Sequence, residues 1–106
     1  MPPRKYLPLA LNMDSRSAVV VGGGEPAFFK AVLLVDFGIS TTVLVEPTTD
    51  VDARLQELAE AEAITLHDRG YNPKDLEGHY LAVVATGDRV TDYRVESDAR
   101  ARGLLV

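Results

Sequence analysis

The stretch VVVGGGEPAFFK, residues 19–30, decides how this sequence folds, because three consecutive glycines join two kinds of predicted secondary structure. Residues 17–21 form a continuous apolar run, which is typical of a strand buried on both faces of a parallel sheet. Residues 25–37 predict a helix, with Pro26 in the first turn, where its missing N–H costs nothing, and Gly38 at the C-terminal cap. The glycines therefore stand where a buried strand passes into a helix.

The rest of the chain continues this alternation of apolar runs and helical segments. We expect strands at residues 41–45, 63–67 and 80–85, a helix from a cap at Thr49 or Asp50 to about residue 62, a turn at 72–78, a helix over 88–102 and the start of a fifth strand at 104–106. Alternating strands and helices call for right-handed crossovers that place helices on both faces of a sheet. The prediction is a single α/β domain over residues 1–106, a Rossmann-like, doubly wound and mainly parallel sheet of about five strands.

Composition narrows the classes of partner. The chain has 106 residues, a net charge of −5 and no cysteine. The acidic balance argues against nucleic-acid and anionic-membrane surfaces, which need clustered lysine and arginine. Without cysteine there are no disulfides or thiolate metal sites. No carboxylate near His67 or His79 has the spacing of a metal ligand, so no metal site is predicted. No apolar run could span a bilayer and no signal-peptide pattern follows the N-terminus, so a cytoplasmic protein is expected.

Gly22, Gly24 and Ala27 fit the pattern G-x-G-x-x-G/A between a predicted strand and a predicted helix. In a dinucleotide site the first glycine permits a tight turn, the second lets the backbone approach a pyrophosphate, and the third small residue lets helix and strand pack. The pyrophosphate then lies at the helix N-terminus, where free N–H groups favour an anion. The bare pattern is weak evidence, but its place inside a strand–helix–strand unit favours NAD as a cofactor over a purely structural turn.

Two strand ends supply further candidates. Glu46, beside Pro47, ends the second predicted strand, where a carboxylate accepts hydrogen bonds from the adenosine ribose and favours NAD over NADP. The alternative is that Glu46 only ends a strand. Thr86 and Gly87 follow the fourth predicted strand and offer a hydroxyl and a bare backbone at the edge where ligands bind. The alternative there is an ordinary turn with Asp88 as helix N-cap.

The glycine turn contains two residues that the pattern does not specify. Gly23 is not required by it, but a glycine there lowers the steric bulk over the phosphates. Glu25 brings a negative charge close to a pyrophosphate, so we expect its side chain to turn away from a ligand, and it also suits the helix dipole. The predicted cofactor-binding residues are Gly22, Gly23, Gly24, Glu25, Pro26, Glu46, Pro47, Thr86 and Gly87.

Together these segments resemble one family, the N-terminal domain of siroheme synthase and the stand-alone precorrin-2 dehydrogenases. The matching positions are residues 6–9, 11–12, 20–25, Ala27, Lys30, 33–34, Gly38, 42–43, Pro47, Tyr71, 75–76, 85–86 and 99–103. The resemblance implies an NAD-dependent oxidoreductase of siroheme, or porphyrin, biosynthesis that oxidises the tetrapyrrole precorrin-2 to sirohydrochlorin. It also implies a homodimer and, in some members, a ferrochelatase activity that inserts ferrous iron.

The sequence departs from the family pattern at three points. The family's catalytic Asp lies just beyond the fifth strand, so no catalytic residue is expected in this chain, and the dimer-forming segments lie further on. Pro26 and Phe28-Phe29 replace a smaller and more polar stretch. Asp92 stands where the family usually has Asn, and Gly87 where it often has Asp. The alternative to an enzyme is therefore a non-catalytic nucleotide-binding or assembly module derived from this family.

Overall fold

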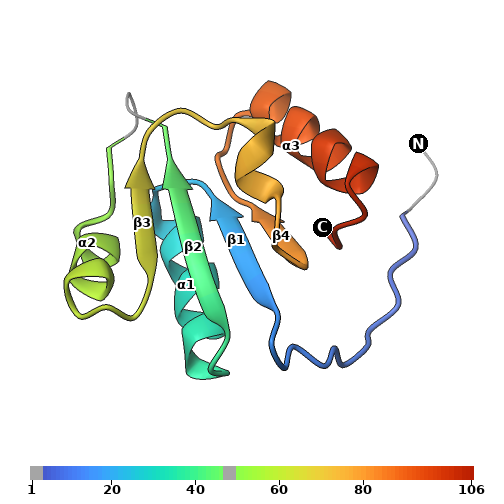
Figure 1. Cartoon of the computed structure of the whole chain (residues 1–106). Coiled ribbons are helices and arrows are strands. Elements are labelled where there is room, and N and C mark those ends of the chain that lie inside the picture. Colours follow the sequence, from blue (N-terminus) through green and yellow to red (C-terminus); the bar gives the residue numbers. More distant parts are fainter. Residues whose placement is uncertain (1–3, 47–49) are drawn as a thin grey trace.

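The computed structural model describes residues 4–46 and 50–106, and within them four parallel strands form one sheet (Figure 1). The elements in chain order are β1 (Ser17–Val21), α1 (Glu25–Asp36), β2 (Ser40–Val45), α2 (Ala53–Glu60), β3 (Thr65–Asp68), the 3-10 helix η1 (Pro73–Leu76), β4 (Leu81–Val84) and α3 (Arg89–Ala101). The strand order is β3-β2-β1-β4, and every neighbouring pair is parallel. The glycine turn after β1 therefore lies between the ends of β2 and β4.

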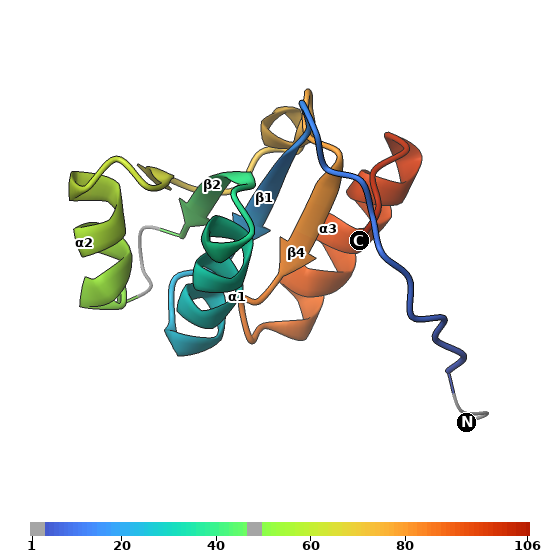
Figure 2. The same ribbon diagram turned by 90° about the horizontal axis from the view of Figure 1, so that it is seen from below.

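The residues of β1 point alternately into two hydrophobic cores, one on each face of the sheet. Ala18 and Val20 pack on the face that α1 and α2 cover, whereas Val19 and Val21 pack on the face that η1 and α3 cover. All four side chains are at most 1% exposed, which is why positions 18–21 contain no polar residue. Figures 1 and 2 show α1 and α3 on opposite sides of the strands, so the Rossmann-like, doubly wound prediction is confirmed.

The predicted fifth strand is reduced to a single bridge. Leu105 pairs in parallel with Leu81. Its N–H donates to the carbonyl of Tyr80 over 3.0 Å, and its carbonyl accepts from the N–H of Ala82 over 2.7 Å. This bridge occupies the side of β4 that faces away from β1. The described chain thus has four strands and one bridging residue in place of about five strands.

The second helix starts and ends elsewhere than the sequence predicted. Asp52, not Asp50, is the N-cap of α2, because its carboxylate accepts a hydrogen bond of 3.0 Å from the N–H of Arg54. The other predicted cap, Thr49, lies outside the described residues. The helix ends at Glu60, and Glu62 has a positive φ of 60°, which a continuing helix cannot contain.

The remaining boundaries lie close to the predicted ones. The third strand is shifted to Thr65–Asp68, and the turn at residues 72–78 contains η1. Gly38 follows α1 with a positive φ of 73°, as its predicted capping position requires. Asp88 is the N-cap of α3 and accepts a hydrogen bond of 3.4 Å from the N–H of Thr91.

The first helix buries one face and exposes another. Ala27 and Ala31 are fully buried against the sheet, whereas Phe29, Leu33 and Phe37 are 54%, 52% and 76% exposed. These three large residues are spaced four apart, so they form one apolar stripe along the outer side of α1. Among the described helices, none is both long and apolar enough to cross a membrane.

Candidate functional site

Gly22 and Gly23 are glycines because the neighbouring strand ends leave no room for a side chain. Gly22 has a positive φ of 146°, and a Cβ atom there would lie 2.2 Å from the carbonyl oxygen of Ala85. A Cβ atom at Gly23 would lie 2.6 Å from Cγ1 of Val45. The turn is further fixed by a hydrogen bond of 2.8 Å from the N–H of Asp52 to the carbonyl of Gly23. The G-x-G-x-x-G/A pattern does not ask for glycine at residue 23, but close packing against β2 does.

Gly24 is different, because nothing in the described structure requires a glycine at this residue. It is the N-cap of α1 in an extended conformation, with φ −91° and ψ −164°, and any residue can adopt that conformation. A Cβ atom there would meet only Cδ of Pro26, at 3.8 Å. Gly24 has no side chain to cap the first-turn N–H groups of α1, and Pro26 carries no N–H. The result is an open helix N-terminus with backbone donors at Glu25 and Ala27, which is the arrangement that binds phosphate groups.

Glu25 points toward the second helix, where an arginine meets it. Its Oε2 atom lies 3.6 Å from Nη2 of Arg54. The same guanidinium donates to the carboxylate of Asp52 through Nε over 3.0 Å and through Nη2 over 2.8 Å. These hydrogen bonds lower the pKa of Asp52 to about 2. The guanidinium carbon also lies 4.0 Å from the ring centre of Phe28, so Arg54 joins the beginnings of α1 and α2.

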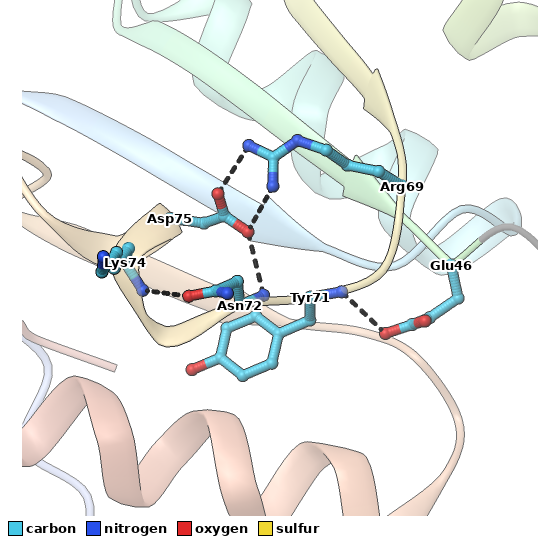
Figure 3. Close-up of polar contacts among 6 residues, drawn as sticks. All are labelled: Glu46, Arg69, Tyr71, Asn72, Lys74 and Asp75. Atoms are coloured by element: carbon cyan, nitrogen blue, oxygen red, sulfur yellow. Dashed lines mark hydrogen bonds and ion pairs between the residues drawn. The ribbon is translucent and has the colours of Figure 1, made fainter.

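Glu46 lies at the end of β2 and holds the loop that follows β3. Its Oε1 atom accepts a hydrogen bond of 3.1 Å from the backbone N–H of Tyr71 (Figure 3). Asp75 fixes the same loop, because it accepts two hydrogen bonds from Arg69, over 3.0 and 2.6 Å, and one from the N–H of Asn72 over 2.9 Å. Pro47, which was predicted to bind the cofactor together with Glu46, lies outside the described residues.

Thr86 and Gly87 form the turn between β4 and α3. The backbone N–H of Thr86 donates to Oδ1 of Asp92 over 3.2 Å, and its hydroxyl donates to the same carboxylate oxygen. The hydroxyl also accepts a hydrogen bond of 3.1 Å from the N–H of Asp88. Gly87 has a positive φ of 80°, and a Cβ atom there would meet nothing within 4 Å. Both residues thus build the ordinary turn that the sequence left as an alternative, next to Gly22.

The structure brings together most of the predicted site residues at the carboxyl edge of the sheet. The glycine turn lies between Glu46, after β2, and Thr86, after β4. No pattern in the sequence indicated Arg54 or Tyr71 as residues of the site. The N-x-x-D spacing of Asn72 and Asp75, a capping box in the structure, would have located the loop but not its bond to Glu46. Within the described part of the chain, no group of three or more His, Cys, Asp or Glu could hold a metal ion.

Comparisons with known proteins indicate the same class of cofactor. Residues 9–106 match a family model whose description reads "Putative NAD(P)-binding". Over 102 residues the chain is 39% identical to a siroheme synthase of Ectopseudomonas mendocina and 42% identical to one of Stutzerimonas stutzeri, covering 96% of this chain and 21% of each relative. It thus spans about a fifth of the length of these curated relatives.

A solved structure shows the same similarity. SirC, a precorrin-2 dehydrogenase, superposes with a TM-score of 0.75 at 27% identity, over 86% of this chain and 44% of that chain. The resemblance to siroheme synthase and precorrin-2 dehydrogenase that the sequence indicated is therefore confirmed. Because the family model covers residues 9–106, this chain belongs to that NAD(P)-binding family.

Proposed function

We propose that this chain binds NAD at the glycine turn and is the cofactor-binding domain of an NAD-dependent precorrin-2 dehydrogenase of siroheme biosynthesis. The observation that carries the proposal is Gly24. Packing explains Gly22 and Gly23 but not Gly24, whose missing side chain leaves the N-terminus of α1 open. In a family of NAD(P)-binding domains, the close approach of a diphosphate supplies the missing reason.

Several of the predicted residues then have a part in holding the cofactor. The first-turn N–H groups of α1 bind the diphosphate. Glu46 uses Oε1 for the loop and keeps Oε2 for the ribose hydroxyls, and its charge disfavours the 2′-phosphate of NADP. On the side away from Glu46, the proposed cofactor site is bordered by Gly22, Thr86 and Gly87. NAD, when bound, supplies the acceptor for the hydride that leaves the tetrapyrrole.

Oxidation of precorrin-2 to sirohydrochlorin, and insertion of ferrous iron, are proposed for the whole protein and not for the described residues alone. This chain contributes cofactor binding, and its similarity to siroheme synthases and to a precorrin-2 dehydrogenase supports a tetrapyrrole substrate. The homodimer and the cytoplasmic location remain predictions, and the apolar stripe on α1 supports the homodimer.

Isothermal titration calorimetry with NAD and with NADP tests the proposal. We expect heat from NAD, weaker binding of NADP, and a rise of the melting temperature with NAD concentration, because a ligand that binds only the folded state stabilises it. No heat and no shift of the melting temperature at saturating NAD would contradict the proposal.

The second candidate function is a non-catalytic nucleotide-binding or assembly module. The observation that favours it is the bulky pair Phe28-Phe29 after the glycine turn, where the family has a smaller and more polar stretch and where Phe29 is 54% exposed. A nucleotide-binding module also predicts NAD binding, but only the first function predicts turnover. An assay for NADH formed from precorrin-2 by the full-length protein distinguishes them.

A further inference from the structure

Glu25 presents an electrostatic difficulty for any anion at the start of α1. A carboxylate in the first helical turn interacts well with the helix dipole when the site is empty. A cofactor diphosphate would share that helix end with Glu25, and like charges repel at separations shorter than the Debye length of ~8 Å at physiological salt. The side chain of Glu25 is 69% exposed, so burial does not hold it away from the helix end.

Arg54 is the cation that faces Glu25. It is the second residue of α2, and its Nη2 atom lies 3.6 Å from Oε2 of Glu25. The guanidinium is held from two other sides, by Asp52 over 2.8 and 3.0 Å and by the ring of Phe28 over 4.0 Å. The charge of Glu57, one helical turn further along α2, also acts on Arg54.

The start of α2 is itself tied to the glycine turn. The N–H of Asp52 donates to the carbonyl of Gly23 over 2.8 Å, so the cap of α2 and the turn before α1 hold a fixed distance. Asp52 therefore fixes both the helix that carries Arg54 and the guanidinium itself. The position of this arginine near the start of α1 therefore follows from its contacts with Asp52 and Phe28.

We propose that Arg54 is a positioning residue that holds the carboxylate of Glu25 aside and neutralises it, so that the N-terminus of α1 accepts the diphosphate of a dinucleotide. The inference rests on the proposed function and names a residue that regulates the strength of that site. Arg54 acts through Glu25 and not by touching the ligand. Removing both side chains should therefore cost much less affinity than removing Arg54 alone.

A double-mutant cycle tests this coupling. The dissociation constant of NAD is measured by calorimetry for wild type, Arg54→Ala, Glu25→Gln and the double variant. We expect Arg54→Ala to weaken binding about tenfold, within the range for coupled neighbours. Glu25→Gln should bind at least as tightly as wild type, and the double variant should bind like Glu25→Gln.

Two readouts separate this role from a merely structural one. The loss in Arg54→Ala should shrink as salt is raised, since salt screens exposed charges. Arg54→Lys should retain most of the affinity, because it keeps the charge while losing the paired hydrogen bonds to Asp52. Arg100→Ala, in the last turn of α3, is the matched control for the loss of one exposed positive charge, and unfolding curves verify that every variant is folded.

Three outcomes would overturn the inference. Unchanged NAD binding in Arg54→Ala would show that Glu25 needs no neutralisation. A double variant as weak as Arg54→Ala would show that the arginine contacts the ligand directly. A wild-type protein that binds neither NAD nor NADP would contradict the proposed function together with this inference, whereas the first two outcomes leave the proposed function intact.

Discussion

At the scale of single residues, the three glycines of one turn have two different causes. Gly22 and Gly23 face backbone and side-chain atoms that would lie 2.2 and 2.6 Å from an added Cβ, so the fold itself excludes larger residues. A Cβ atom at Gly24 would make only an ordinary contact of 3.8 Å with Cδ of Pro26, and its backbone suits any residue. A glycine that the fold itself does not require is typical of a site where a ligand approaches the backbone closely.

Replacing Gly24 and, separately, Gly23 by alanine distinguishes these two causes. Gly24→Ala should leave the melting temperature close to that of wild type and weaken NAD binding at least several-fold, because the added methyl group lies where the diphosphate approaches. Gly23→Ala, the matched control, should lower the free energy of unfolding by about 1–3 kcal/mol, the usual cost of overpacking. Thermal unfolding and calorimetry measure both effects. A Gly24→Ala variant with full NAD affinity would remove the main support for the cofactor site.

Glu46 combines a structural bond with the predicted ribose contact, and two substitutions distinguish them. Glu46→Gln keeps an oxygen that can accept from Tyr71 but loses the charge, so stability should hold while the preference for NAD over NADP falls. Glu46→Ala also loses the hydrogen bond, and the free energy of unfolding should fall by about 1 kcal/mol. Titrations with both cofactors measure the preference. An unchanged NAD-to-NADP ratio in Glu46→Gln would exclude the ribose role.

At the scale of elements, apolar runs and punctuating glycines were enough to predict all four strands and all three α-helices within a few residues. The errors lie where local alternatives compete. Thr49, Asp50 and Asp52 are all good N-caps by residue type, and the contact of Asp52 with Gly23, distant in sequence, selects the last. The same reason explains why two contacts of the candidate site could not be predicted from the sequence. The glycine pattern is local, whereas the pairs Arg54–Glu25 and Glu46–Tyr71 exist only after the helices and strands have packed.

The loop between β3 and η1 depends on one carboxylate. The side chain of Asp75 is only 9% exposed. This burial opposes ionisation, but the hydrogen bonds from Arg69 and Asn72 outweigh it and lower the pKa of Asp75. An aspartate whose pKa is lower in the folded than in the unfolded protein stabilises the fold above its ordinary pKa. That stabilisation is lost as the pH falls through the folded value.

Acid titration of stability therefore depends on Asp75. Asp75→Ala should lower the free energy of unfolding at neutral pH by about 1.5–3 kcal/mol, the range for hydrogen bonds to a charged group. The stability of the variant should then fall less steeply than that of wild type as the pH decreases below about 5. Chemical unfolding over a pH series measures both effects. Parallel pH profiles in the two proteins would show that Asp75 gives no pH-dependent stability.

At the scale of the whole molecule, the two edges of the sheet have different surroundings. The carboxyl edge carries the glycine turn and the two strand ends beside it. Toward the other edge lies an open groove of about 1000 Å³ between the C-terminal half of α1 and the segment 9–17, with Leu33 and Phe37 in its lining. The segment that leads into this groove also exposes apolar side chains, with Tyr6 and Leu7 each 81% exposed.

The homodimer predicted from the family resemblance has a natural interface in this apolar surface. Tyr6 and Leu7 are exposed, and the groove has an apolar lining with one acidic residue, Asp14, and one basic residue, Arg16. One copy thus offers an exposed apolar segment and the other an apolar groove. We therefore expect a homodimer in which residues 4–7 of each copy lie in the groove of the other. Burial of such apolar surface is the main driving force of association.

Sedimentation velocity tests the dimer. Wild type should sediment as a dimer, and Phe37→Glu should sediment as a monomer with unchanged NAD affinity, since Phe37 lies at the end of α1 opposite the glycine turn. Val90→Glu is the matched control, because Val90 is 78% exposed on α3 and outside the groove. It should leave the dimer intact. A charge buried in an apolar interface is costly, so Phe37→Glu should not form this dimer. A Phe37→Glu variant that remains dimeric would therefore place the interface elsewhere, and a monomeric wild type would exclude the homodimer.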